Sequence, residues 1–319
     1  MVRPHIRASA RATIGLLGVV LREPDLRRIQ VASLVSATAR WAYLVALLVV
    51  AFRMAGPLGL ALLGIVRTVP TMIAVPLAGA AGSRMTGRRL LVLTYAARAV
   101  ALTLSAAGAL AGVPLLVFGP AAIDAVLGTL RRPVQAALLP LVTRTPGELV
   151  AANTATTTGD GLAGIAGPLL GAFLLAAGGP AAVLALSAAG FLVAAGLASR
   201  ISVQGGATGA ATASTLRILG GGARALLGSP IPRLVTAGFI VQVVVRGALN
   251  VLLVPASASL FGAGGQDVGQ LFAAMGVGGV IGGIAATVAI GPGRLTGTFI
   301  ASLFGWGLPL IVIGFVTSM

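Results

Sequence analysis

Hydrophobic residues in this chain are gathered in runs of about twenty, and short polar segments that contain arginine separate the runs. An α-helix needs about 20 apolar residues to cross the hydrocarbon core of a bilayer, so each run predicts one crossing. The nine crossings expected cover residues 29–52, 57–79, 90–111, 113–130, 151–178, 180–198, 233–255, 268–290 and 295–316. The predicted fold class is therefore all-α, a polytopic transmembrane helical bundle.

Two longer polar stretches divide the chain. Residues 1–28 carry six arginines around an apolar patch that is too short to span a bilayer, which predicts a cytoplasmic, interfacial N-terminal segment. Residues 200–232 are rich in Gly, Ala, Ser and Thr, a composition typical of a flexible linker. We therefore expect an N-terminal six-helix bundle over 29–199, a cytoplasmic linker, and three further helices over 233–319.

Composition narrows the class of protein further. With 57% hydrophobic and 9% charged residues, the chain is far too apolar for a soluble domain. Its net charge of +16 comes from 22 basic residues, all arginine, against 6 acidic ones. These arginines lie in loops and are not clustered with aromatic residues, so we expect the lipid bilayer and a small-molecule solute as partners, and no nucleic acid.

Cysteine is absent and there is a single histidine, so a metal site built from thiolate or several histidine ligands is not expected. No Ser/His/Asp set is evident either, so an enzyme is not expected, and neither is a cofactor. Arginine is distributed unevenly: seventeen of the 22 fall in segments predicted to be cytoplasmic, whereas Arg53 alone falls in an outside loop. This asymmetry predicts a multi-pass protein of the plasma (inner) membrane with its N-terminus in the cytoplasm.

Charged residues at membrane depth are the candidates for function. Insertion of each costs about 2.5 to 3.5 kcal/mol, so each needs a partner, a watery cavity or a role. Arg40, Arg67, Asp124 and Arg246 lie near the predicted midplane, and their net charge of +2 favours anionic or amphiphilic solutes. Asp124 is the candidate for a protonatable switch in transport. The alternative is a static ion pair of Asp124 with Arg40 or Arg67 that only fixes helix packing.

Two other charges lie nearer the cytoplasmic ends of their crossings, Arg98 in the third and Asp160 in the fifth. Arg98 is close enough to the interface to extend its guanidinium into the headgroup region, so we expect it to have no role in transport.

The segment 76–89 is a glycine-rich, basic turn between two crossings, and it predicts a tight cytoplasmic hinge. It resembles the loop between helices 2 and 3 of the major facilitator superfamily, in which glycine is followed after three residues by Asp-Arg, one residue, and Gly-Arg-Arg. Here a serine stands in place of the aspartate, and the last triplet falls one residue late. The resemblance implies a gating loop; an ordinary basic loop is the alternative. Its residues would be Gly79, Ser83, Arg84, Gly87, Arg88 and Arg89.

The fifth predicted crossing holds small residues four apart, which allow close helix contact, and a proline that removes one backbone hydrogen bond. Gly164, Gly167, Pro168 and Gly171 resemble the Gly-Pro motif of the superfamily's fifth helix, which is associated with exporters. Generic small-residue packing is the alternative. The runs 131–140 and 148–153 resemble exporter-type members. The runs 245–252, with Asn250, and 306–310 resemble an actinobacterial-type group that is sometimes fused to a cyclic-nucleotide-binding domain.

A weak internal repeat agrees with two related halves, because Pro24, Arg27 and Arg40 correspond to Pro230, Arg233 and Arg246 at one constant offset. The resemblance implies twelve crossings around a midplane site and alternating access. With nine crossings expected, the chain would be an incomplete permease, an exporter with proton coupling as a further expectation. The competing hypothesis is a transporter-like membrane scaffold or sensor that anchors a regulatory domain and moves little solute.

Overall fold

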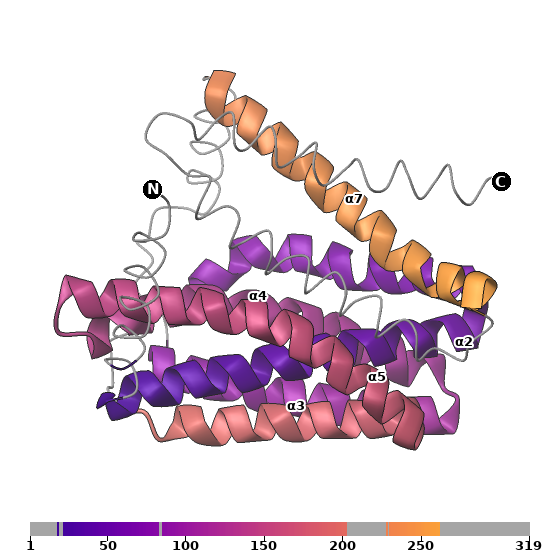
Figure 1. Ribbon diagram of the computed structural model, residues 1–319, viewed down its shortest axis with the longest axis horizontal. Helices are drawn as coiled ribbons and strands as arrows, with labels where there is room; N and C mark the ends of the chain where they lie inside the picture. Colours follow the sequence, from indigo (N-terminus) through magenta and orange to yellow (C-terminus); the bar gives the residue numbers. More distant parts are fainter. Residues whose placement is uncertain (1–17, 19–21, 83–84, 203–227, 229, 262–319) are drawn as a thin grey trace, which may run out of the picture. The chain divides into compact units, whose positions relative to one another are not determined.

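The computed structural model describes residues 18, 22–82, 85–202, 228 and 230–261 of the chain (Figure 1). Within these residues it contains helices and no strand, which confirms the predicted all-α class for this part of the chain. The helices are α2 (Pro24–Gly82), α3 (Gly87–Ala111), α4 (Pro114–Val142), α5 (Pro146–Ser199) and α7 (Pro230–Phe261).

Glycines break the two longest helices. In α2 the backbone leaves helical dihedral angles at Ala55 and Gly56, where φ is 57° at the glycine, and in α5 it does so at Gly179, where φ is 70°. Glycine adopts such left-handed angles without the steric cost of a Cβ. A proline follows each break, where its missing N–H fits the first turn of the next helix. The four resulting segments cover the ranges predicted for crossings one, two, five and six.

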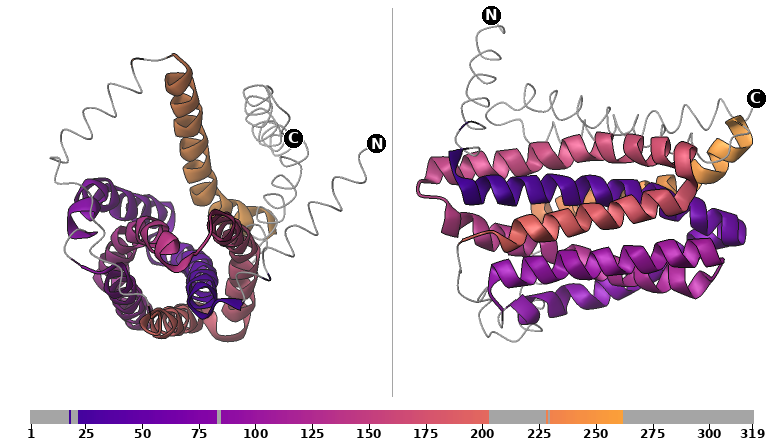
Figure 2. Two further views of the ribbon diagram at one scale, coloured as in Figure 1. Left: turned by 90° about the vertical axis from the view of Figure 1, so that its left-hand side faces the viewer. Right: turned by 90° about the horizontal axis from the view of Figure 1, so that it is seen from below.

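Helices α2 to α5 are each long and apolar enough to cross a membrane. They run side by side, with α2 packed mainly on α5, and α3 packed on both α4 and α5 (Figure 2). Large apolar side chains cover the outside of this bundle: Met72, Phe173, Leu110 and Leu115 are 69–78% exposed. A surface of this kind is suited to lipid, so the chain is a membrane-embedded protein. Helix α7 covers predicted crossing seven.

The glycines of the predicted helix-5 motif lie against α2. A Cβ added at Gly167 would lie 2.5 Å from Trp41 Cβ and 2.7 Å from the Thr38 carbonyl oxygen, and one at Gly171 would lie 3.3 Å from the Ala42 oxygen. At Gly164 the nearest atom is the Trp41 indole nitrogen at 3.8 Å. The backbone keeps helical angles at Pro168, and the break in α5 lies at Gly179. Close approach of α5 to α2 is thus what these small residues provide.

The predicted end of crossing four at residue 130 is wrong as a helix boundary. Helix α4 continues through Pro133 and Pro140 to Val142, so the polar stretch expected to leave the bundle after residue 130 is helical. The reason is that Arg131 is buried and paired inside the bundle. Predicted crossings eight and nine, and most of the N-terminal segment and of the linker, lie outside the described residues.

The α5–α2 contact gives a stability prediction. Replacing Gly167→Ala forces Trp41 or the backbone of α2 to shift, and such overpacking costs about 1 to 3 kcal/mol. The control Gly161→Ala lies in the same helix with nothing within 4 Å of the new Cβ, so it should leave stability equal or slightly raised. Thermal unfolding of the purified protein in detergent measures both. Equal stability of the two variants would contradict the close packing.

Candidate functional site

A buried carboxylate joins three helical segments in the middle of the bundle. Asp124 of α4 has a side chain that is 0% exposed. Arg98 of α3 donates from Nε to its Oδ1 at 2.8 Å, and Arg67 of α2 donates from Nη1 to its Oδ2 at 3.3 Å. We call these three residues the Asp124 cluster. Two cations and one anion give the cluster a net charge of +1.

The cluster lies deep in the membrane. Asp124 comes ten residues after the start of α4 at Pro114, and Arg67 comes ten residues after Pro57 in the second half of α2. At 1.5 Å per residue both lie roughly 15 Å from those helix ends, which is half of a hydrocarbon core of about 30 Å. The predicted midplane position of both residues therefore agrees with the helix bounds.

The two arginines of the cluster differ in their surroundings. The side chain of Arg98 is 2% exposed and its guanidinium lies 4.2 Å from the centroid of the buried Phe191 ring. The side chain of Arg67 is 21% exposed, and its guanidinium lies 5.6 Å from the ring of Tyr43. Arg98 is thus enclosed by protein, whereas Arg67 is the member of the cluster that reaches the surface of the described bundle.

Two buried hydroxyl groups, those of Tyr43 and Ser105, lie next to each other near the cluster. Tyr43 lies within the electrostatic field of all three cluster residues and beside Ser105. Neither hydroxyl meets hydrogen-bond geometry with any partner among the described residues, and both residues are 0% exposed. An unsatisfied buried polar group costs about 1 to 3 kcal/mol, so such groups point to a function or to a missing partner.

A second carboxylate is held in the same way between α4 and α5. Arg131 donates from Nη2 to both oxygens of Asp160, at 3.0 and 3.1 Å, and Arg132 donates to Oδ2 at 2.9 Å. The side chain of Arg131 is 7% exposed and that of Arg132 is 77% exposed. We call these residues the Asp160 cluster; it too has a net charge of +1.

Side-chain hydrogen bonds extend the Asp160 cluster to α2. Arg131 Nη1 donates to Ser33 Oγ at 2.8 Å, and Gln135 Nε2 donates to Thr156 Oγ1 at 3.3 Å. Thr156 in turn donates to Gln30 Oε1 at 3.1 Å. In contrast to the surroundings of Asp124, these hydroxyls all have partners. The network therefore fixes the packing of α2, α4 and α5.

The residues predicted near the midplane do not all meet in the structure. The ion pair weighed for Asp124 with Arg67 is present, but Arg40 makes no ion pair among the described residues, and its guanidinium lies 4.7 Å from the ring of Trp41. The expectation that Arg98 extends to the interface is wrong, because its side chain turns inward to Asp124 and Phe191. Arg246 and Asn250 belong to α7, but their side chains lie outside the described part.

Of the predicted gating loop, Gly87, Arg88 and Arg89 form the first turn of α3, which Thr86 caps by accepting a hydrogen bond from the Arg89 amide. Arg88 donates to the Ile201 carbonyl at 3.0 Å, and so ties the start of α3 to the residues that follow α5. Gly79 lies within helix α2, and Ser83 and Arg84 lie outside the described residues.

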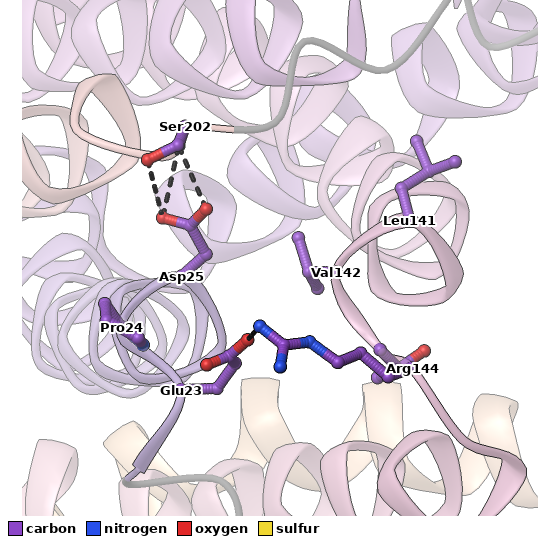
Figure 3. A pocket seen from close by; sticks show the side chains of 8 residues that line it. Glu23, Pro24, Asp25, Leu141, Val142, Arg144 and Ser202 are labelled. Atoms are coloured by element: carbon purple, nitrogen blue, oxygen red, sulfur yellow. Dashed lines mark hydrogen bonds and ion pairs between the residues drawn. The ribbon is translucent and has the colours of Figure 1, made fainter.

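At the same end of the bundle, polar residues line a cavity of about 310 Å³ (Figure 3). Arg144 donates to Glu23 at 2.6 Å across it, and Asp25 accepts from the backbone N–H of Ser202 at 3.1 Å. Arg28 also pairs with Asp25, at 2.9 Å. These contacts join the start of α2 to the loop before α5 and to the residues after it.

Sequence reasoning missed the buried role of Arg131 and its partners. The signal that could have found it is the spacing of Arg131 and Gln135, four residues apart on one face of an otherwise apolar helix. Asp160, the partner on α5, is marked by its charge within an apolar run, whereas the partner Ser33 on α2 carries no comparable local signal. Among the described residues, no group of three or more His, Cys, Asp or Glu side chains could hold a metal ion.

The sequence was also compared with known proteins. No protein-family model matches the chain, and no curated protein matches it.

The burial of Asp124 predicts a strong dependence of stability on its charge. Asp124→Asn leaves Arg98 buried without a counterion, and breaking a buried pair in this way costs about 3 to 5 kcal/mol. Glu23→Gln removes an exposed pair with Arg144, which is worth about 0 to 1 kcal/mol. Thermal unfolding in detergent should show the contrast. A similar loss in both variants would mean that the Asp124 cluster is solvated.

Proposed function

We propose that this membrane protein is a secondary transporter of the major facilitator type, an exporter of small amphiphilic or anionic solutes that works by alternating access. The observation that carries the proposal is the Asp124 cluster, which places three charged side chains near the middle of membrane-spanning helices. Charged residues at this depth are expensive, and they mark substrate and ion pathways in membrane proteins.

The charge of the clusters supports an anionic or amphiphilic solute. Each cluster has one more positive than negative side chain, so it would repel a cationic solute and attract an anionic one. The helices around them are apolar over most of their length, which suits the hydrophobic part of an amphiphile. Asp124 is the group we propose for proton coupling, since it is a carboxylate that one arginine could release and re-bind during the transport cycle.

The resemblance to the superfamily supports the same proposal. The glycines of the fifth predicted crossing give α5 a close contact with α2, and the basic residues of the predicted gating loop lie at the start of α3. We propose that the N-terminus is cytoplasmic and that the protein resides in the plasma (inner) membrane, because arginine is concentrated in the segments on one side.

One observation favours the second candidate, a transporter-like scaffold or sensor. The carboxylates of Asp124 and Asp160 are already neutralised by protein side chains, and an ion pair that is complete in this way can fix helix packing without any solute. In that case the charges at the midplane would only determine the arrangement of the helices.

Flux through vesicles separates the two candidates. The purified chain, reconstituted in liposomes, should carry an amphiphilic anion such as benzenesulfonate in a saturable manner, and should carry benzyltrimethylammonium at least tenfold more slowly. Glu23→Gln, which changes an exposed pair at the end of the bundle, is the control and should retain the flux. Reconstituted, folded protein that moves neither ion faster than empty liposomes would favour the scaffold.

Orientation can be tested independently of transport, because the chain has no cysteine of its own. Val113→Cys, between α3 and α4, should react with a membrane-impermeant maleimide in intact cells. Gly147→Cys, at the start of α5, should react only after the membrane is permeabilised, because it lies at the arginine-rich side. The reverse labelling pattern would show that the N-terminus is outside.

A further inference from the structure

We propose that Arg67 binds the anionic group of the solute by exchanging its ion pair with Asp124 for one with the solute, while Arg98 keeps Asp124 neutralised. The inference rests on the proposed transport function and names the substrate class and the residue that recognises it. It assigns different roles to two arginines that share one carboxylate.

The geometry of the two ion pairs supports this division. The contact of Arg98 with Asp124 is short, at 2.8 Å, and its side chain is 2% exposed. The contact of Arg67 is a single hydrogen bond at 3.3 Å, longer than the 2.7 to 2.9 Å that is usual between charged partners, and its side chain is 21% exposed. Arg67 is therefore the weaker partner of Asp124 and the one that a solute can reach.

The exchange does not leave an unpaired charge in the membrane. When Arg67 moves away, Asp124 keeps its hydrogen bond and its opposite charge from Arg98. An anionic group on the solute then supplies the counterion of Arg67. Removing the only partner of a buried charge is strongly destabilising, and the presence of two arginines on Asp124 avoids this cost.

The hydroxyl groups of Tyr43 and Ser105 complete the chemistry of the site. The two hydroxyls neighbour each other, neither meets hydrogen-bond geometry with a partner among the described residues, and each can donate a hydrogen bond. The Arg67 guanidinium lies over the ring of Tyr43, at 5.6 Å. Hydroxyl donors near an excess of positive charge are suited to an oxygen anion such as a carboxylate, sulfonate or phosphate ester.

The backbone near Arg67 also permits movement. Pro70 has no N–H, so the Val66 carbonyl, one residue before Arg67, lacks the usual hydrogen bond of a helix. Thr71 Oγ1 donates to the Arg67 carbonyl at 2.6 Å, a side-chain contact of the kind that bends helices. This turn of α2 is therefore held by fewer regular backbone hydrogen bonds than its neighbours.

The Asp160 cluster provides the matched comparison. Arg132 is the exposed second arginine on the partly buried Asp160, and Arg131 holds this carboxylate through both oxygens without it. The hydroxyls of Ser33 and Thr156 in that network already have partners. Arg132→Gln thus removes an arginine of the same kind where no unpartnered donors are available for an anion.

The experiment measures binding in detergent, without transport. The full chain is unfolded by heat in the presence of benzenesulfonate, neutral benzenesulfonamide or benzyltrimethylammonium. A ligand that binds only the folded protein raises Tm, and the stabilisation grows with the logarithm of its concentration divided by Kd. We expect benzenesulfonate alone to raise Tm, with its apparent affinity reduced at least tenfold in Arg67→Gln, reduced less in Arg67→Lys, and changed less than twofold in Arg132→Gln.

Tyr43→Phe separates binding from packing. Because the only neighbour of the tyrosine hydroxyl is the Ser105 hydroxyl, which does not meet hydrogen-bond geometry with it, its loss should change the Tm of the ligand-free protein little, while it lowers the affinity for benzenesulfonate about threefold to tenfold. A purely structural tyrosine would show no such loss of affinity. If Arg67→Gln does not fold, Arg67→Lys and Tyr43→Phe still decide the question.

Failure of this inference can be told apart from failure of the transport proposal. Equal stabilisation of wild type and Arg67→Gln by benzenesulfonate, or no stabilisation of wild type, would overturn the role of Arg67. Binding that depends on Arg67 in a chain without flux would leave the anion site in place and reject transport. Flux of benzenesulfonate that is unchanged in Arg67→Gln would support transport and reject the anion site at Arg67.

Discussion

The arrangement of the described bundle depends on one constraint: a charge placed in hydrocarbon has to be compensated by the protein itself. The buried carboxylate of Asp124 in α4 and the partly buried one of Asp160 in α5 are each paired with two arginines. Their pairs connect α4 to α2 and α3 in one cluster, and α4 to α5 in the other. These two ion-pair clusters therefore limit how the helices can pack against one another, and apolar side chains pack around them.

Acidic residues are scarce in this chain, and each one that the structure describes forms an ion pair or a hydrogen bond. Glu23 and Asp25 hold together one end of the bundle through Arg144, Arg28 and Ser202. Glu148 accepts from the backbone N–H of Arg144 and caps the start of α5. Since arginines greatly outnumber these carboxylates, the bundle retains positive charge after all the pairs have formed. An anionic solute would interact with this excess.

Packing and binding need not be separate functions of a charged cluster. A single arginine on each carboxylate would be enough to hold the bundle together. That arginine could not leave, however, because the carboxylate would then be unpaired. The second arginine makes the difference at Asp124, where Arg98 is enclosed and Arg67 reaches the surface of the described bundle. At Asp160 the second arginine, Arg132, is exposed, and the hydroxyls in the network of its partner Arg131 are already satisfied. Two clusters of equal net charge thus differ in the donors that they leave free.

The sequence by itself determined the helices and the depth of their charges, because the length of an apolar run and the position of a residue within it are local properties. Glycine and proline marked the breaks at Gly56 and Gly179 for the same reason. Only the tertiary structure decided which charges meet: Asp124 pairs with residues 26 and 57 positions away, and not with Arg40. Partner choice depends on how each helix is rotated about its axis, and a helix that is apolar on all sides carries no pattern that fixes this rotation.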